Sequence, residues 1–127
     1  DINAIIDKVK LWEMVIFPSM YHDTNMYINW EDVNLYIDKH ECLRMYIKLL
    51  SENPKVLEAL VNNSECSIER LCHIKTVSSK LFHQSIMLVH RSKLIPWIER
   101  SDCNYRGTNY LTNMTDAELR AKIIELF

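Results

Sequence analysis

Residues 78–98 read SSKLFHQSIMLVHRSKLIPWI and give the strongest structural signal in the chain. Apolar side chains recur there every three or four positions with small polar residues between them, which is the spacing of an amphipathic helix. A serine at position 78 or 79 can cap the start of this helix, and Pro96 kinks or ends it. The spacing predicts a central bundle helix over residues 78–95. Its apolar side consists of Leu81, Phe82, Ile86, Leu88, Val89 and Ile95.

The same spacing recurs on both sides of this segment and predicts further helices. They are expected over residues 2–17, over 30–51 as one helix or two, from Pro54, from Ser67, and from the capping box that Thr115 and Glu118 form. The polar stretches 18–28 and 101–114 are expected to be loops. The helix over 2–17 should end at Pro18, and Asn29 can cap the helix that follows.

These elements predict an all-α fold, a single helical domain over residues 1–127. We expect a bundle of about six or seven helices. Helices in 1–41 come first, residues 42–98 form the core bundle, and 99–127 hold a loop and a C-terminal helix.

The chain has one glycine, Gly107, among its 127 residues. Phosphate-binding loops and dinucleotide-binding turns need two or three glycines at fixed spacing, because the backbone must approach the phosphate closely. Tight two-residue hairpins also favour glycine, because their turn residues adopt positive φ. The composition therefore argues against a nucleotide-binding α/β enzyme and against a hairpin-rich β domain.

No motif in the sequence indicates catalysis or a metal site. The four cysteines form no Cys-x-x-Cys pair, and no histidines stand at zinc-ligand spacing. We expect four reduced, mostly buried thiols, no metal, no cofactor and no enzymatic activity. No apolar run approaches the roughly 18 residues of a membrane span, so no membrane partner is expected. The cysteines are Cys42, Cys66, Cys72 and Cys103.

The formal net charge is −2, but it is divided unevenly along the chain. Residues 1–69 carry six Lys/Arg and twelve Asp/Glu, whereas 70–106 carry seven Lys/Arg and two Asp/Glu. A basic face is predicted if the side chains of 70–106 lie together. Such a face would suit acidic peptides or nucleic-acid phosphates.

Residues 42–98 resemble the N-terminal helical domain of transcription elongation factor S-II, which elongin A and the integrase-binding domain of a chromatin growth factor share. Leu43–Leu50 (LRMYIKLL) is similar to the family's leucine-rich helix, and Pro54 to the start of its short helix. Ser67–Ile74 is similar to its next helix, and Ser92–Pro96 (SKLIP) to its closing lysine–leucine run. Arg91 stands where the family has a tryptophan.

This resemblance implies a non-catalytic protein–protein interaction module in transcription or RNA metabolism, in the nucleus or the cytoplasm. The partner would be a short, disordered or helical segment, often acidic with an aromatic anchor. From charge and periodicity, we expect the binding residues to be Lys75, Lys80, Arg91 and Lys93 as charge contacts and Phe82 in an apolar groove.

Two alternatives stay open. The first is a nucleic-acid-binding domain that uses the basic segment 70–106. The second is a viral host-defence inhibitor, because the chain resembles small all-helical poxviral proteins of the Bcl-2-like type in size, scarcity of glycine and richness in Ile, Asn, Tyr, Asp and Met. That second resemblance rests on composition alone.

Overall fold

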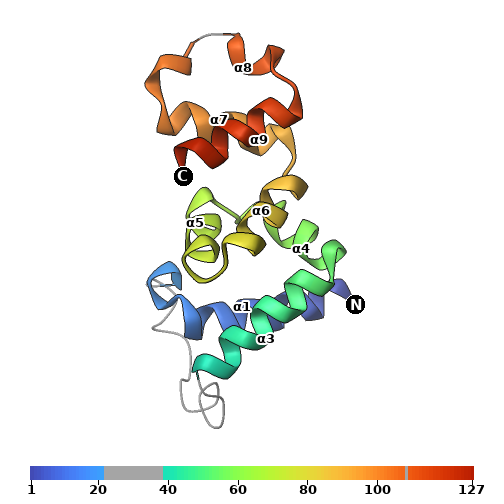
Figure 1. Ribbon diagram of the computed structural model, residues 1–127. Helices are drawn as coiled ribbons and strands as arrows, with labels where there is room; N and C mark the ends of the chain where they lie inside the picture. The colour runs from blue at the N-terminus through green and yellow to red at the C-terminus, as the bar shows by residue number, and fades with distance from the viewer. Residues whose placement is uncertain (22–38, 108) are drawn as a thin grey trace.

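The computed structural model describes residues 1–21, 39–107 and 109–127, and all regular structure in these ranges is helical (Figure 1). The prediction of an all-α fold is therefore confirmed. The described ranges contain eight α-helices: α1 (Ile2–Ile16), α3 (Lys39–Glu52), α4 (Pro54–Val61), α5 (Ile68–Val77), α6 (Ser79–Leu88), α7 (Arg91–Ser101), α8 (Tyr110–Asn113) and α9 (Asp116–Leu126). Two 3₁₀-helices accompany them, η1 (Pro18–Tyr21) and η3 (Cys103–Tyr105).

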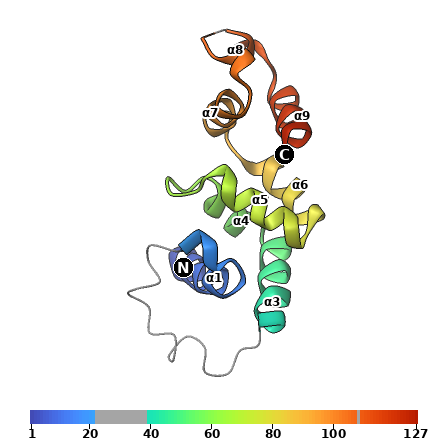
Figure 2. The ribbon, with the colours of Figure 1, turned by 90° about the vertical axis from the view of Figure 1, so that its left-hand side faces the viewer.

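The helices are stacked in three tiers (Figures 1 and 2). The first tier holds α1 and α3 side by side, the second holds α4, α5 and α6, and the third holds α7, α8 and α9. Helix α6 packs against α3, α4, α5 and α9, so it joins all three tiers. The segment predicted to be central is thus central, although its helix is shorter than expected.

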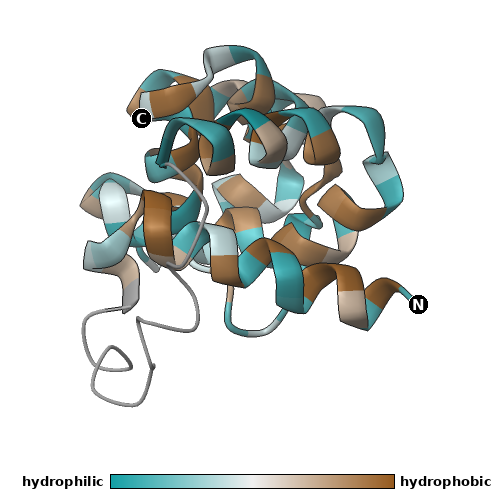
Figure 3. Cartoon of the chain, turned by 90° about the horizontal axis from the view of Figure 1, so that it is seen from below, coloured by the Kyte–Doolittle hydropathy of each residue, from teal (hydrophilic) through white to brown (hydrophobic). Residues whose placement is uncertain are grey.

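A single cluster of buried apolar side chains runs through the tiers, from Ile6 in α1 to Ile123 in α9. Apolar and polar residues alternate around the helices, as their colouring in Figure 3 shows. The core is therefore built by the first and last helices as well as by residues 42–98.

The predicted helix over 78–95 is in fact two helices. Helix α6 ends at Leu88, and α7 begins at Arg91. Asn62, at the end of α4, stabilises the break between the two helices. Its side-chain amide donates to the Leu88 carbonyl oxygen at 2.9 Å, and its side-chain oxygen accepts the His90 N–H at 2.9 Å. A tertiary contact from a distant helix end thus overrides the local helical pattern.

Pro96 neither ends nor begins a helix, because α7 runs through it to Ser101. A proline inside a helix leaves the carbonyl four residues earlier without its N–H partner. That carbonyl belongs to Ser92, which is exposed in the first turn of α7, where water can replace the missing bond.

The stretch 101–114, predicted to be a loop, contains η3 and the short helix α8. Leu111 anchors α8 because its side chain is buried in the core. Gly107 lies between these two elements with φ +73°, a left-handed conformation that favours glycine.

Most predicted helix boundaries are confirmed. Helix α1 ends before Pro18, the Ser78 hydroxyl accepts the Leu81 N–H, and the capping box of Thr115 and Glu118 is formed. Of the predicted helix over 30–51, the structure describes the part from Lys39 as α3. The cap at Asn29 and most of the loop over 18–28 lie outside the described residues.

A buried ion pair ties the first tier to the second. The Arg70 Nε of α5 donates to the Glu13 carboxylate of α1 at 3.0 Å, and the Tyr46 hydroxyl of α3 donates to the same carboxylate at 2.8 Å. The exposed fractions of the Glu13 and Arg70 side chains are 0% and 6%. One carboxylate oxygen therefore joins three helices inside the core.

We expect Arg70→Met to lower the free energy of unfolding by about 3–5 kcal/mol, because it leaves the Glu13 charge buried without its cation. Urea unfolding followed by circular dichroism measures this loss. The control is Lys10→Met, which breaks the exposed Lys10–Glu65 pair and should cost less than about 1 kcal/mol. Equal losses in the two variants would show that the buried pair has no special role. Adding Glu13→Leu to Arg70→Met should recover part of the loss.

Candidate binding surface

Arg91, one of the predicted charge contacts, is used inside the molecule. Its guanidinium pairs with Asp116 at 2.7 Å and donates to the carbonyl oxygens of Thr112 and Met114 at 3.2 and 3.0 Å. It therefore closes the end of α8 and holds the start of α9 beside α7.

Lys93 has a similar role at the turn between α4 and α5. Its ammonium donates to the carbonyl oxygens of Asn63 and Cys66 at 2.6 and 3.1 Å, and its side chain is partly buried. Lys75 also bonds to a carbonyl oxygen, that of Phe127. These bonds use one of the three N–H donors of the Lys75 ammonium and two of the three of Lys93.

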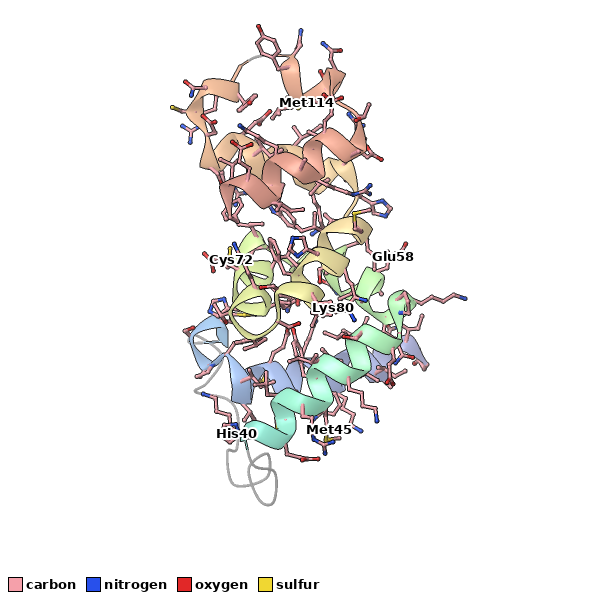
Figure 4. The ribbon with its side chains drawn as sticks, in the orientation of Figure 1. His40, Met45, Glu58, Cys72, Lys80 and Met114 are labelled. Carbon is pink, nitrogen blue, oxygen red and sulfur yellow. The ribbon has the colours of Figure 1, made fainter. Side chains whose placement is uncertain are left out.

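The two other predicted binding residues, Phe82 and Lys80, differ in their exposure to solvent. Phe82 is 1% exposed, so it belongs to the core and cannot line an open groove. Lys80 is exposed and has no ion pair within the described residues. Figure 4 shows Lys80 on the middle tier. The structure does bring Lys75 and Phe82 together, with the Lys75 ammonium 5.4 Å from the centroid of the Phe82 ring, but it uses Arg91 and Lys93 in bonds to other parts of the chain.

An apolar hollow of about 380 Å³ lies between α1 and α3 of the first tier. We call it the α1–α3 groove. Its apolar lining consists of Trp12 from α1 and Met45 and Leu49 from α3, and its charged lining of Lys8, Glu41, Arg44, Lys48 and Glu52. Figure 4 shows Met45 at the lower end of the molecule, away from Lys80.

The charges around this groove are only partly paired. Arg44 pairs with Glu41 one turn earlier, at 2.5 Å. Lys8 and Lys48, one from each helix, have no ion pair within the described ranges. The Lys8 ammonium lies 5.3 Å from the centroid of the Trp12 ring, within the range of a cation–π contact. Two lysines that pair with no acidic side chain of the described residues thus flank an apolar floor.

A second hollow lies where α4 meets the junction of α6 and α7. Glu58, His90 and Arg91 line it, and Met87 beside them is 59% exposed. Most of its lining is polar, and Arg91 there is already bonded to Asp116. This hollow offers a partner less apolar contact than the α1–α3 groove.

The thiols show no arrangement for chemistry. Cys42 and Cys66 are buried, Cys72 is partly buried and Cys103 is exposed, so the expectation of mostly buried thiols holds for two of the four. Burial raises the pKa of the Cys66 and Cys72 thiols, which makes the reactive thiolate scarcer near neutral pH. Within residues 1–21, 39–107 and 109–127, no three His, Cys, Asp or Glu side chains cluster as metal ligands would.

Comparisons with protein-family models, with curated proteins and with solved structures give no match to this chain. The resemblance of residues 42–98 to the elongation-factor domain therefore stays a prediction. No helix in the described part of the chain is long and apolar enough to cross a lipid bilayer.

The helical spacing of the apolar residues in α1 and α3 predicts that they lie in the core, so it does not reveal the α1–α3 groove. Trp12 is indeed mostly buried, yet it also forms part of the groove floor. A signal was present in α3: Met45 and Leu49 stand one turn apart at the edge of the buried stripe of Cys42, Tyr46 and Leu50, and both are only partly buried. An apolar stripe that is wider than its contact with the core indicates a second contact surface.

The carbonyl bonds of Lys93 predict that this lysine stabilises the fold, whereas the exposed Lys80 does not. Lys93→Met should lower the free energy of unfolding by about 1–3 kcal/mol, because two carbonyl oxygens lose their donor. Lys80→Met, the control, should change it by less than about 0.5 kcal/mol. Chemical unfolding of both variants checks this. If Lys93→Met were as stable as Lys80→Met, the carbonyl bonds would not contribute to the fold.

Proposed function

We propose that this chain is a non-catalytic protein interaction module that docks a short segment of a partner protein in the α1–α3 groove. The observation that carries the proposal is the combination of Trp12, Met45 and Leu49 on the floor with Lys8 and Lys48 at the rim. Within residues 1–21, 39–107 and 109–127 neither lysine has an ion pair. Grooves between helices that combine an apolar floor with charged edges suit helices and short motifs.

Protein binding is favoured over nucleic-acid binding because of how the basic side chains are used. Lys75, Arg91 and Lys93 are bonded to backbone carbonyls, which leaves them fewer donors for phosphates. Single-strand binding also needs exposed aromatic rings on which bases stack. Tyr110 is the one large aromatic side chain that is strongly exposed in the described ranges.

The proposal includes a role in transcription or RNA metabolism, in the nucleus or the cytoplasm. This part is supported by the resemblance of residues 42–98 to the elongation-factor domain. A host-defence inhibitor of the Bcl-2-like type would also hold its partner in a groove between helices. The identity of the partner distinguishes these two roles.

Selection from a random library of 14-residue peptides tests the proposal. The wild-type chain should enrich related peptides, and Met45→Asp should lose their binding by at least tenfold, because it places a charge on the apolar floor. Met87→Asp is the matched control: it changes an exposed methionine outside the groove and should keep the binding. Circular dichroism verifies that both variants are folded.

Two results would contradict the proposal. One is that no peptide is enriched while a 20-nucleotide RNA or DNA duplex binds in a salt-sensitive way. The other is that the enriched peptides bind Met45→Asp as tightly as the wild type.

A further inference from the structure

The shape of the α1–α3 groove indicates a helical partner segment. Its lining residues on α3 recur every three or four positions from Glu41 to Glu52, so they follow one face of the helix for three turns. At a rise of 1.5 Å per residue, this face is about 16 Å long. A third helix can lie along two packed helices by placing its ridge of side chains in the groove between them.

The charges of the groove indicate that this helix is acidic. Lys8 and Lys48 lie on opposite helices, so they stand on the two sides of whatever occupies the floor. Glu52 is one turn beyond Lys48, but no ion pair joins them. Arg44 is already neutralised by Glu41. Among the described residues, Lys8 and Lys48 are thus the cations of the groove that have no ion pair. A partner with carboxylates on both sides of an apolar stripe would pair with both, as residues at the flanking positions of a coiled coil do.

Lys8 has a further role because it lies over Trp12. Trp12 is 6% exposed, and the Lys8 ammonium stands above its ring. A carboxylate at the edge of the groove would draw this ammonium away from the ring, since an ion pair replaces a cation–π contact of similar strength. The ring would then be open to an apolar side chain of the partner.

We infer that the α1–α3 groove binds an acidic amphipathic helix of about three turns, whose carboxylates pair with Lys8 and Lys48 while its apolar stripe covers Trp12, Met45 and Leu49. The inference rests on the proposed function and adds the chemistry of the partner. Before the partner binds, the Lys8 ammonium covers the Trp12 ring, and a carboxylate of the partner displaces it.

A charge exchange tests the inference, with the peptides enriched by the wild-type chain as probes. Their sequences should carry Asp or Glu on both sides of an apolar stripe of helical spacing. The double variant Lys8→Glu, Lys48→Glu should weaken their binding by at least tenfold. Peptides in which Lys replaces these acidic residues should bind the double variant and not the wild type.

The matched control is the double variant Lys55→Glu, Lys80→Glu. It changes the net charge by the same amount on exposed positions of α4 and α6 outside the groove, and should change the binding less than twofold. Acrylamide quenching of tryptophan fluorescence gives a second readout. It should increase in Lys8→Ala, which uncovers Trp12, and stay unchanged in Lys55→Ala.

The outcomes separate this inference from the proposed function. Enriched peptides that depend on Met45 but carry no acidic residues would overturn the inference and leave the docking function intact. An equal loss in the two double variants would also overturn it, because net charge rather than the groove would then determine the binding. The absence of any enriched peptide would contradict the docking function itself.

Discussion

The buried Glu13–Arg70 ion pair is the constraint on which the rest of the molecule depends. Removing two charges from water is costly, and only a close and fixed geometry offsets that cost. Here Glu13 meets both Arg70 of α5 and the Tyr46 hydroxyl of α3. Successive helical residues point about 100° apart. Fixing Glu13 against Tyr46 therefore also fixes their neighbours Trp12 and Met45, which line the same groove on the outer side of the pair of helices.

The scarcity of glycine is linked to the way in which basic side chains bond to carbonyl oxygens at helix ends. Many helices end in a glycine of left-handed conformation, which lets the last carbonyls find N–H partners nearby. In the described ranges only Gly107 has positive φ. The carbonyls at the ends of α4, α6 and α8 are bonded instead by side chains from other helices. The donors are Asn62 to Leu88, Arg120 to Ile86, Lys93 to Asn63 and Arg91 to Thr112.

Local patterns predicted the helices well, and long-range contacts explain where they failed. The starts at Pro54, Ser78 and Thr115 depend on residues within one turn, so the sequence shows them directly. The break after Leu88 depends on Asn62, which is 26 residues away in the chain. Charge counting over 70–106 could not reveal, for the same reason, that Lys93 bonds to carbonyl oxygens of another turn. Helical spacing does not separate a side chain on a groove floor from one in the core, so it does not show the α1–α3 groove.

The contrast between the tiers argues for the first tier as the binding surface. A side chain whose donors already hold the fold must break those bonds before it can bind a partner. Arg91 and Lys93 are in that position. Arg91 holds α8 and α9 beside α7 within the third tier, and Lys93 joins the third tier to the turn between α4 and α5. Within the described ranges Lys8 makes a cation–π contact and no bond to a backbone carbonyl, so its displacement leaves no carbonyl there without a donor. The cations that can bind a partner most readily are therefore those whose donors do not stabilise the fold. In the first tier these cations, Lys8 and Lys48, stand beside the apolar floor of the α1–α3 groove, whose position the Glu13–Arg70 ion pair fixes.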